Sequence, residues 1–400
     1  MDALIKIFAT FIVVVYLLSR KVDLGYCLLL GTLILGILFR IPILNLLIFT
    51  ISAFKEPSNQ SLITTLFFII ILVNVMDKTG QLEKTASITK ALVKNPKIIL
   101  AAMPAFIGFL PMPGGALFSA PLIEKTDEGE ELSPSSRSFI NYWFRHVWEY
   151  FSPLYPGVIL ATTISGIKIP RFILLQLPFS LVAITIGFLI MKRFKITNNA
   201  SHSSDRSNWK DLFIYILPVV IPIICIIMGL VSWISIFIGV LISILISVIK
   251  DHISFKKVFT LTFENFSWDI LLNVIGIIVF KTFIEKTGSI PQIAQFFINQ
   301  NIPIVLIITI LPFLVGLFSG ITMAPIGITF PLIIPIIKGN FYGSVSLAYA
   351  CGFMGVMLSP AHLCLVVSNQ YFKADIQKVY RLLLLPVAII ILTGLVLYRI

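Results

Sequence analysis

The hydrophobic positions of this chain form long runs with few polar residues rather than an alternating or one-sided pattern. Apolar runs occupy residues 3–18, 24–39, 62–76 and 172–191, and short polar segments separate them. A helix needs about 20 apolar residues to cross the hydrocarbon core of a bilayer, so runs near that length indicate membrane spans. We therefore predict an all-α polytopic membrane protein whose surroundings are the lipid bilayer.

One apolar stretch, residues 104–121, cannot form a continuous helix. It reads PAFIGFLPMPGGALFSAP, and its middle holds Pro113, Gly114 and Gly115. Proline removes a backbone donor and clashes with the preceding turn, and glycine adds backbone freedom. Broken backbone persists at membrane depth only where protein or a water-filled cavity satisfies it. This pattern predicts a re-entrant hairpin whose tip lies inside the membrane.

A second stretch of the same kind lies in the other half of the chain, at residues 312–331. It is also bounded by prolines, and small residues interrupt its middle. The two stretches share one register, because Gly316 follows Gly108 by 316 − 108 = 208 positions. Other glycine, proline and charged residues match at the same offset, which indicates an internal repeat.

The repeat divides the chain into residues 1–191, a cytoplasmic linker at residues 192–210, and residues 211–400. Each half is predicted to hold five crossings, a re-entrant hairpin and a discontinuous helix. Because five is an odd number, the halves insert in opposite directions, as in many secondary transporters. Lys and Arg concentrate in the linker and in the loops on its side, and such loops are cytoplasmic. Both termini are therefore predicted to lie outside.

Each half offers two broken elements, the hairpin tip and the interrupted crossing that follows it. Half-helix N-termini favour anions, and exposed carbonyls at half-helix C-termini favour cations such as Na⁺. Four such ends meeting at mid-membrane would form one site for an anionic solute, with Na⁺ as a candidate ion at the hairpin tips. The alternative is that these residues are helix-packing points or kinks. The predicted ligands in the broken elements are Pro113, Gly114, Gly115, Ser119, Ser152, Ser319, Gly320, Thr322 and Ser359.

The first interrupted crossing carries polar residues at helical spacing, which predicts one stripe along a helix. Its members are Asn141, Arg145, Glu149 and Ser152. A charge at the bilayer centre costs about 2.5–3.5 kcal/mol on insertion scales, so these residues face a partner or a cavity. Either Arg145 and Glu149 neutralise each other, or Arg145 binds a substrate carboxylate while His146 or Glu149 carries a proton.

Two polar residues follow the second break, at Ser359–Pro360. His362 comes directly after it, and Asn369 lies two turns further on. His362 is either a hydrogen-bonded packing residue or a ligand for substrate or proton, and Asn369 is a candidate for ion coupling. The four cysteines all lie in apolar segments without motif spacing. That placement favours small buried residues over a disulfide frame or a metal site.

Composition narrows the class of function. Hydrophobic residues make up 58% of the chain and charged residues 12%, which excludes an ordinary soluble protein. The formal net charge of +12 comes from short basic loops, which favours positive-inside topology over a nucleic-acid surface. The sequence completes neither a zinc-protease motif nor a Walker A loop. We therefore expect no enzyme activity, no direct ATP coupling and no cofactor apart from the candidate Na⁺.

Three segments together resemble a known family: PMPGGALFSAP, NYWFRHVWEYFSPLYPG and LSPAHLCLVVSNQYF. They resemble a family of uncharacterised prokaryotic integral membrane proteins, a domain-of-unknown-function family of the ion-transporter superfamily. That superfamily also includes gluconate, citrate, dicarboxylate and sodium/proton transporters. The resemblance implies inverted repeats with re-entrant hairpins and discontinuous helices, a homodimer, and a multi-pass protein of the prokaryotic inner membrane.

The function predicted from these patterns is secondary active transport. The expected substrate is a small organic anion, a carboxylate, moved across the cytoplasmic membrane together with Na⁺ or H⁺. A sodium/proton antiporter is the alternative within transport. An intramembrane enzyme that uses His146 and Glu149 is the alternative of another class, and broken elements in both halves favour transport over it.

Overall fold

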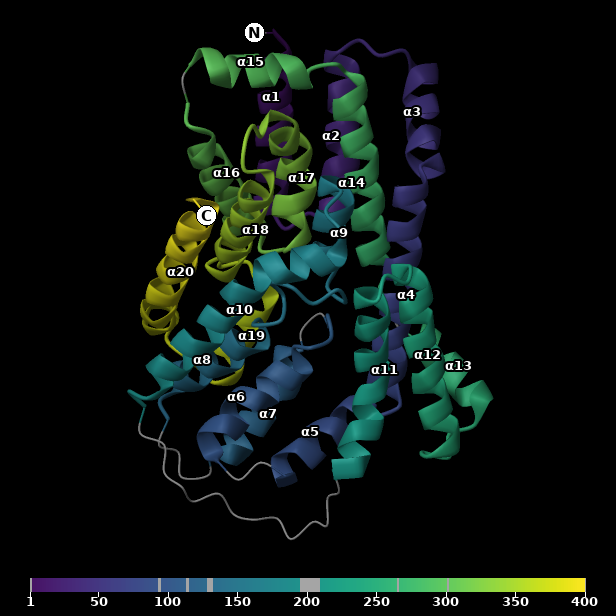
Figure 1. Ribbon diagram of the computed structural model, residues 1–400, viewed down its shortest axis with the longest axis vertical. Helices are drawn as coiled ribbons and strands as arrows, with labels where there is room; N and C mark the ends of the chain where they lie inside the picture. The colour runs from purple at the N-terminus through teal and green to yellow at the C-terminus, as the bar shows by residue number, and fades with distance from the viewer. Residues whose placement is uncertain are drawn as a thin grey trace.

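All the regular secondary structure in the residues that the computed structural model describes is helical, and these residues contain no strand (Figure 1). The prediction of an all-α fold is confirmed. The predicted linker at residues 192–210 lies mostly outside the described residues. The described residues are 2–92, 95–112, 115–127, 132–194, 209–264, 266–300 and 302–399.

The helices of the first half begin close to the N-terminus and end before the linker. They are α1 (Asp2–Ser19), α2 (Leu24–Leu38), α3 (Ile43–Lys55), α4 (Pro57–Lys78), α5 (Gln81–Leu92), α6 (Pro96–Ile107), α7 (Ala116–Thr126), α8 (Pro134–Arg145), α9 (Pro156–Ser165) and α10 (Ile169–Met191).

The helices of the second half follow in the same order, with one 3₁₀ turn added. They are α11 (Trp209–Ile227), α12 (Ser232–Ile249), α13 (Phe255–Phe263), α14 (Trp268–Lys286), α15 (Ile290–Asn299), α16 (Ile304–Ser319), α17 (Met323–Ile333), η1 (Ile334–Ile336), α18 (Phe341–Met357), α19 (Leu363–Tyr371) and α20 (Ile376–Arg399).

The start positions of matching helices differ by a nearly constant amount. The offset is 304 − 96 = 208 residues between α6 and α16, and 341 − 134 = 207 residues between α8 and α18. Figure 1 shows α5, α6 and α7 at one end of the molecule, and α15 with the start of α16 toward the opposite end. Two oppositely inserted repeats require this arrangement. Their insertion across a bilayer stays a prediction.

The apolar helices of the described residues are of two kinds, those long enough to cross a membrane and shorter ones. Five helices are long and apolar enough to cross a membrane, or six if α13 and α14, which meet at 52°, form one bent span. Other apolar helices, such as α2, are shorter. The ten crossings therefore stay a prediction, because the crossings beyond these five or six would have to be formed by short or broken helices. The five long helices are α4, α10, α11, α12 and α20.

All four predicted interruptions are present. Residues 108–115 separate α6 from α7, although Pro113 and Gly114 lie outside the described residues. In the second hairpin, Gly320 ends α16 in the left-handed conformation, with φ +66°. Glycine adopts that conformation at no steric cost.

The two discontinuous helices are broken between α8 and α9 and between α18 and α19. Pro156 occupies the first turn of α9, where a missing N–H costs nothing. The first break begins earlier than expected, because α8 ends at Arg145. Glu149 and Ser152 therefore do not continue the predicted helical stripe, and that interpretation was wrong beyond Arg145.

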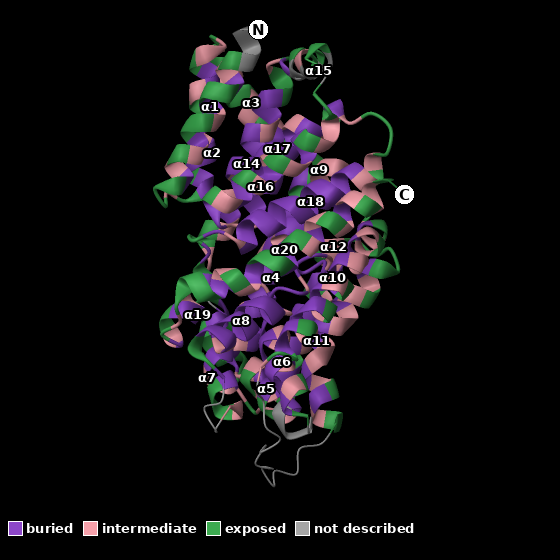
Figure 2. Ribbon diagram, turned by 90° about the vertical axis from the view of Figure 1, so that its left-hand side faces the viewer, coloured by how far each residue is buried: buried purple, intermediate pink, exposed green. Residues whose placement is uncertain are grey.

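Burial increases toward the centre of the molecule. Figure 2 shows buried residues gathered through the middle, with exposed residues on outer helices such as α1 and α2. Helix α18 is buried on all its faces from Ser344 to Met357, as expected for a central helix that is apolar all round. The ends of the two broken helices consequently lie in the protein interior.

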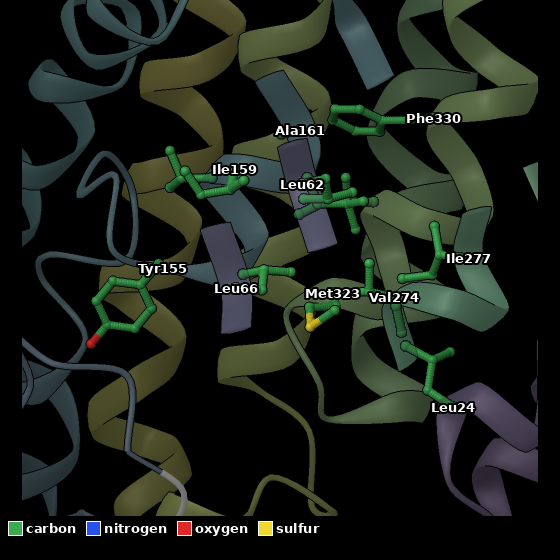
Figure 3. Packing of buried hydrophobic residues seen from close by; sticks show 14 of the residues in the cluster. Leu24, Leu62, Leu66, Tyr155, Ile159, Ala161, Val274, Ile277, Met323 and Phe330 are labelled. Carbon is green, nitrogen blue, oxygen red and sulfur yellow. The ribbon is translucent and has the colours of Figure 1, made fainter. Parts of the chain in front are cut away.

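One hydrophobic core joins the two halves of the chain. Figure 3 shows Leu24 of α2, Leu66 of α4 and Ile159 of α9 packed with Val274 of α14 and Phe330 of α17. All five side chains are nearly inaccessible to solvent. Because first-half and second-half helices share this core, it fixes the hairpins and the broken helices relative to one another.

Candidate functional site

The two broken helices meet through a pair of histidines. His146 lies in the turn after α8, and His362 is the N-cap residue of α19. Their Nε2 atoms lie 3.1 Å apart, and the side chains are only 2% and 8% exposed. The two broken helices thus meet at this contact, although the histidines lie 216 positions apart in the sequence.

Backbone carbonyls fix the orientation of both imidazole rings. The Nδ1 atom of His146 lies 2.5 Å from the Tyr142 carbonyl oxygen, and that of His362 lies 2.7 Å from the Gly320 carbonyl oxygen. A carbonyl oxygen only accepts, so each Nδ1 carries a proton and donates it. Each neutral ring then has a lone pair on Nε2. The two lone pairs face each other and repel unless a proton or metal cation lies between them.

Glu149 connects the first break to the second hairpin. Its Oε1 atom lies 3.6 Å from His146 Nε2, and its Oε2 atom accepts a hydrogen bond from the Thr322 hydroxyl at 3.1 Å. The Tyr349 hydroxyl donates to the main-chain oxygen of Glu149 at 2.7 Å. These contacts hold a buried carboxylate beside the histidine pair.

Arg145 extends to the tip of the first hairpin. Its Nη2 donates to the Met112 carbonyl oxygen at 2.6 Å, while its buried Nε has no hydrogen-bond partner among the described residues. Gly115 packs against the guanidinium group, since a Cβ there would lie 2.9 Å from Nε. Glu149 pairs with His146 instead. Within the described part of the chain, the Arg145–Glu149 pair considered as an alternative is therefore not formed.

Two glycines let the hairpins approach the broken helices closely. A Cβ on Gly108 would overlap the carbonyl oxygen of Arg145, and a Cβ on Gly316 would overlap that of Gly352. These glycines are 208 positions apart, and their two contacts are 352 − 145 = 207 positions apart. Each hairpin thus touches its broken helix at the same point of the repeat.

Asn141 and Asn369 join helices rather than contact the histidines. The Asn141 amide accepts from the Ser119 hydroxyl at 2.5 Å and donates to the Ser368 hydroxyl at 2.9 Å. Asn369 accepts from Ser138 at 2.5 Å, and its Nδ2 has no partner among the described residues. These contacts link α7, α8 and α19. The predicted ligand roles of Ser119 and the two asparagines stay predictions.

The other predicted hydroxyl groups have local contacts. Ser152 and Ser359 each accept a hydrogen bond from the main-chain N–H two residues on, at 3.5 and 3.2 Å. The Ser319 hydroxyl donates to a main-chain oxygen of its own helix at 3.4 Å. Among the predicted ligands that the structure describes, Thr322 and Gly320 of the second hairpin make hydrogen bonds with the side chains of Glu149 and His362, respectively. The ligand roles of the three serines stay predictions.

Cys364 also belongs to the site, and the sequence analysis did not predict this. It was interpreted as a small buried residue, and it is buried. Its sulfur, however, lies with a ring nitrogen of His146 and of His362 in a group whose atoms are all within 4.8 Å of one another. Its position two residues after His362, beside a helix break, was the only local signal.

A cavity lies between α4 and the first hairpin. Its volume is about 190 Å³, larger than the roughly 150 Å³ apolar cavity that holds benzene in another protein. Its wall includes Met112, whose carbonyl oxygen binds Arg145. The polar part of the wall comes from Asn74, Asp77 and Lys78 of α4 and from Ser267.

Comparison with solved structures finds a protein of similar fold. The YdaH transporter of Alcanivorax borkumensis, whose topology is described as unusual, matches with a TM-score of 0.62. The match covers 87% of this chain and 86% of that chain at 13% sequence identity, so the likeness is one of fold. No curated protein matches the sequence. The profile of the family described as "Protein of unknown function (DUF401)" matches residues 1–400, which confirms the predicted resemblance, and the chain belongs to that family.

Proposed function

We propose that the protein is a secondary active transporter of the cytoplasmic membrane that moves a small organic anion, coupled to Na⁺ or H⁺. Two features support transport in general: a fold like that of the YdaH transporter, and broken helix ends that meet in the protein interior. Substrate sites of secondary transporters are built from such discontinuous helices. The proposal that the substrate is an anion rests on the buried guanidinium group of Arg145.

Arg145 is a buried cation, and among the described residues no carboxylate lies in direct contact with it. The residue is 2% exposed, and removing an ion from water costs several kcal/mol unless a partner offsets it. Among the described residues, its guanidinium group has one hydrogen bond to a neutral carbonyl and an unused Nε donor. Guanidinium groups present a planar pair of donors that matches a carboxylate. A substrate carboxylate at the hairpin tip would supply the missing partner.

The neighbouring cavity limits the size of the substrate. A volume of about 190 Å³ suits a solute somewhat larger than benzene. Lys78 on its wall adds a positive charge that Asp77, 3.8 Å away, partly offsets. These features favour a small carboxylate with one or two charges over a long-chain acid or a polyanion.

Ligand-dependent stability tests this proposal across many candidate substrates at once. The purified protein is heated with a panel of small mono- and dicarboxylates, in sodium or in choline salts. A ligand at 100 times its Kd stabilises the folded state by about 2.7 kcal/mol. We expect at least one carboxylate to raise the melting temperature, and the Arg145→Gln variant to lose that response. Proteoliposome uptake of the same carboxylate should fall to background, and imposed sodium or pH gradients identify the coupling ion.

Arg137→Gln is the matched control, because it removes an arginine from the same helix away from the hairpin tip. Arg137 pairs with Asp127 at 2.7 Å. We expect this variant to keep the carboxylate response even if its basal stability falls. An Arg145→Gln protein that responds and transports like wild type would exclude Arg145 from the site and remove the basis of the proposal.

A further inference from the structure

The His146, His362 and Cys364 side chains form a group of donors that anion binding does not use. One ligand atom from each side chain lies within 4.8 Å of the other two, and all three residues are buried. Two nitrogens bound to one tetrahedral zinc ion, each at about 2.0–2.1 Å, lie roughly 3.3 Å apart. The observed separation of the Nε2 atoms is 3.1 Å. The histidines are therefore already spaced for a shared ion.

The surroundings of each ring match those of metal-binding histidines. Such histidines donate their second ring N–H to a backbone carbonyl or a carboxylate, which fixes the tautomer and raises ligand basicity. His146 and His362 both make this contact through Nδ1, with the carbonyls of Tyr142 and Gly320. As a result both Nε2 lone pairs point into the same space. Two neutral rings in this arrangement repel each other unless a cation lies between them.

Glu149 lies next to His146 and is the candidate for a fourth donor. Glu149 Oε1 lies 3.6 Å from His146 Nε2, and a hydrogen bond from Thr322 holds the other carboxylate oxygen. Glu149 lies outside the group of ligand atoms that are all within 4.8 Å of one another. Its carboxylate would therefore have to move toward His362 and Cys364 to reach a common ion at about 2.0–2.2 Å.

The donor types decide the class of ion. Two imidazoles, one thiolate and one carboxylate suit zinc and related divalent ions, whereas Mg²⁺ and Ca²⁺ prefer all-oxygen sites. Four protein ligands leave no open position, which is typical of a structural site. His146 and Glu149 lie in the break after α8, whereas His362 caps α19 and Cys364 lies in the first turn of α19. A bound ion would therefore fasten the two discontinuous helices together.

We infer that His146, His362 and Cys364 bind one divalent transition-metal ion of the zinc class, with the Glu149 carboxylate as fourth ligand. Binding needs the Cys364 thiol to release its proton, because the thiolate is the ligand. The inference goes beyond the proposed transport of an anion. Its measurements involve neither a carboxylate nor transport, so the two can fail separately.

Cobalt substitution tests the site directly. The full-length protein is purified with a chelator, freed of it, and titrated with Co²⁺, whose absorption spectrum reports tetrahedral geometry and thiolate ligation. We expect one Co²⁺ per chain, a thiolate-to-cobalt band, displacement by Zn²⁺, and a higher melting temperature with Zn²⁺. The Cys364→Ser variant should lose the thiolate band. His362→Gln should weaken binding by more than the roughly 10–100-fold that loss of a supporting hydrogen bond costs.

Matched controls come from residues outside the cluster. Cys225→Ser in α11 and His252→Asn in the loop after α12 remove the same functional groups elsewhere, and both should bind as wild type does. The spectrum of unmodified protein already reports the thiolate, so the test does not depend on folding of the variants. Wild-type protein that binds no stoichiometric Co²⁺ or Zn²⁺ would overturn the inference, as would binding unchanged by Cys364→Ser. A proton shared by the two Nε2 atoms would then account for their contact.

Discussion

Gly108 controls how closely the first hairpin packs against the helix that carries Arg145. A Cβ at this position would overlap the Arg145 carbonyl oxygen, and backbone cannot move aside as a side-chain end can. The Gly108→Ala variant should therefore be less stable by about 1–3 kcal/mol, the usual cost of overpacking. The shift would also displace Arg145, so we expect a weaker response to carboxylate. Thermal unfolding with and without the carboxylate measures both effects.

Gly36→Ala is the control for this prediction. Its Cβ would lie 2.7 Å from the Cδ2 atom of Leu46, the flexible end of a side chain. Rotation of Leu46 relieves that contact, so stability should change by less than about 1 kcal/mol. Equal losses in the two variants would show that backbone contact at Gly108 is not what limits the hairpin.

At the scale of elements, buried amides hold α7, α8 and α19 together. Asn141 makes hydrogen bonds with Ser119, Ser368 and the Ala116 carbonyl oxygen. Hydrogen bonds between membrane helices average about 0.6 kcal/mol in double-mutant cycles. Loss of all three in Asn141→Ala should therefore lower the free energy of unfolding by about 2 kcal/mol, measured by denaturation in detergent.

Asn299→Ala serves as the control, because Asn299 is exposed and bonds only Gln295 among the contacts described. Its stability should match wild type within about 0.5 kcal/mol. If Asn141→Ala were as stable as this control, the amide would not be holding the three helices. Its predicted role as a substrate ligand would then become the better explanation for a buried asparagine.

The positions of the hairpins and helix breaks could be predicted from nearby prolines and glycines. The exact helix ends could not, because they depend on contacts between residues far apart in the sequence. Proline and glycine limit backbone geometry wherever they occur, so the hairpins and both breaks could be located from sequence. The end of α8 at Arg145 could not, because the path of residues 146–155 depends on contacts such as Tyr349 to Glu149 and Tyr155 to Gly108. Cys364 was missed for the same reason, since no pattern links it to His146, 364 − 146 = 218 positions away.

For the whole molecule, the sequence repeat does not correspond to two separate cores. The Asn273 side chain in α14 accepts from the Gly25 main-chain N–H in α2 at 2.7 Å. Gln81 at the start of α5 bonds Ser243 and Ser247 in α12. Helices of one half thus pack on helices of the other. We infer that neither half folds stably alone. The offset of the repeat could nevertheless be predicted from the sequence.

Opposite insertion of the two halves is the whole-molecule prediction that labelling can test. Figure 1 places α5 and α15, which occupy matching positions in the repeat, at opposite ends of the molecule. Ser87 of α5 and Asn299 of α15 are both exposed, so Ser87→Cys and Asn299→Cys report the two ends. The basic segment around α5 is expected to be cytoplasmic. A membrane-impermeant maleimide should therefore label Asn299→Cys in intact cells and Ser87→Cys only after lysis.

The parent for both variants is Cys225→Ser, because Cys225 is the one partly exposed cysteine and the other three are buried. That parent should remain unlabelled in intact and in lysed cells. Labelling of both introduced cysteines from one side would contradict inverted insertion, since the α5 and α15 ends would then share a compartment. A reversed pattern would preserve the inverted repeat and place both termini in the cytoplasm, in conflict with the distribution of Lys and Arg.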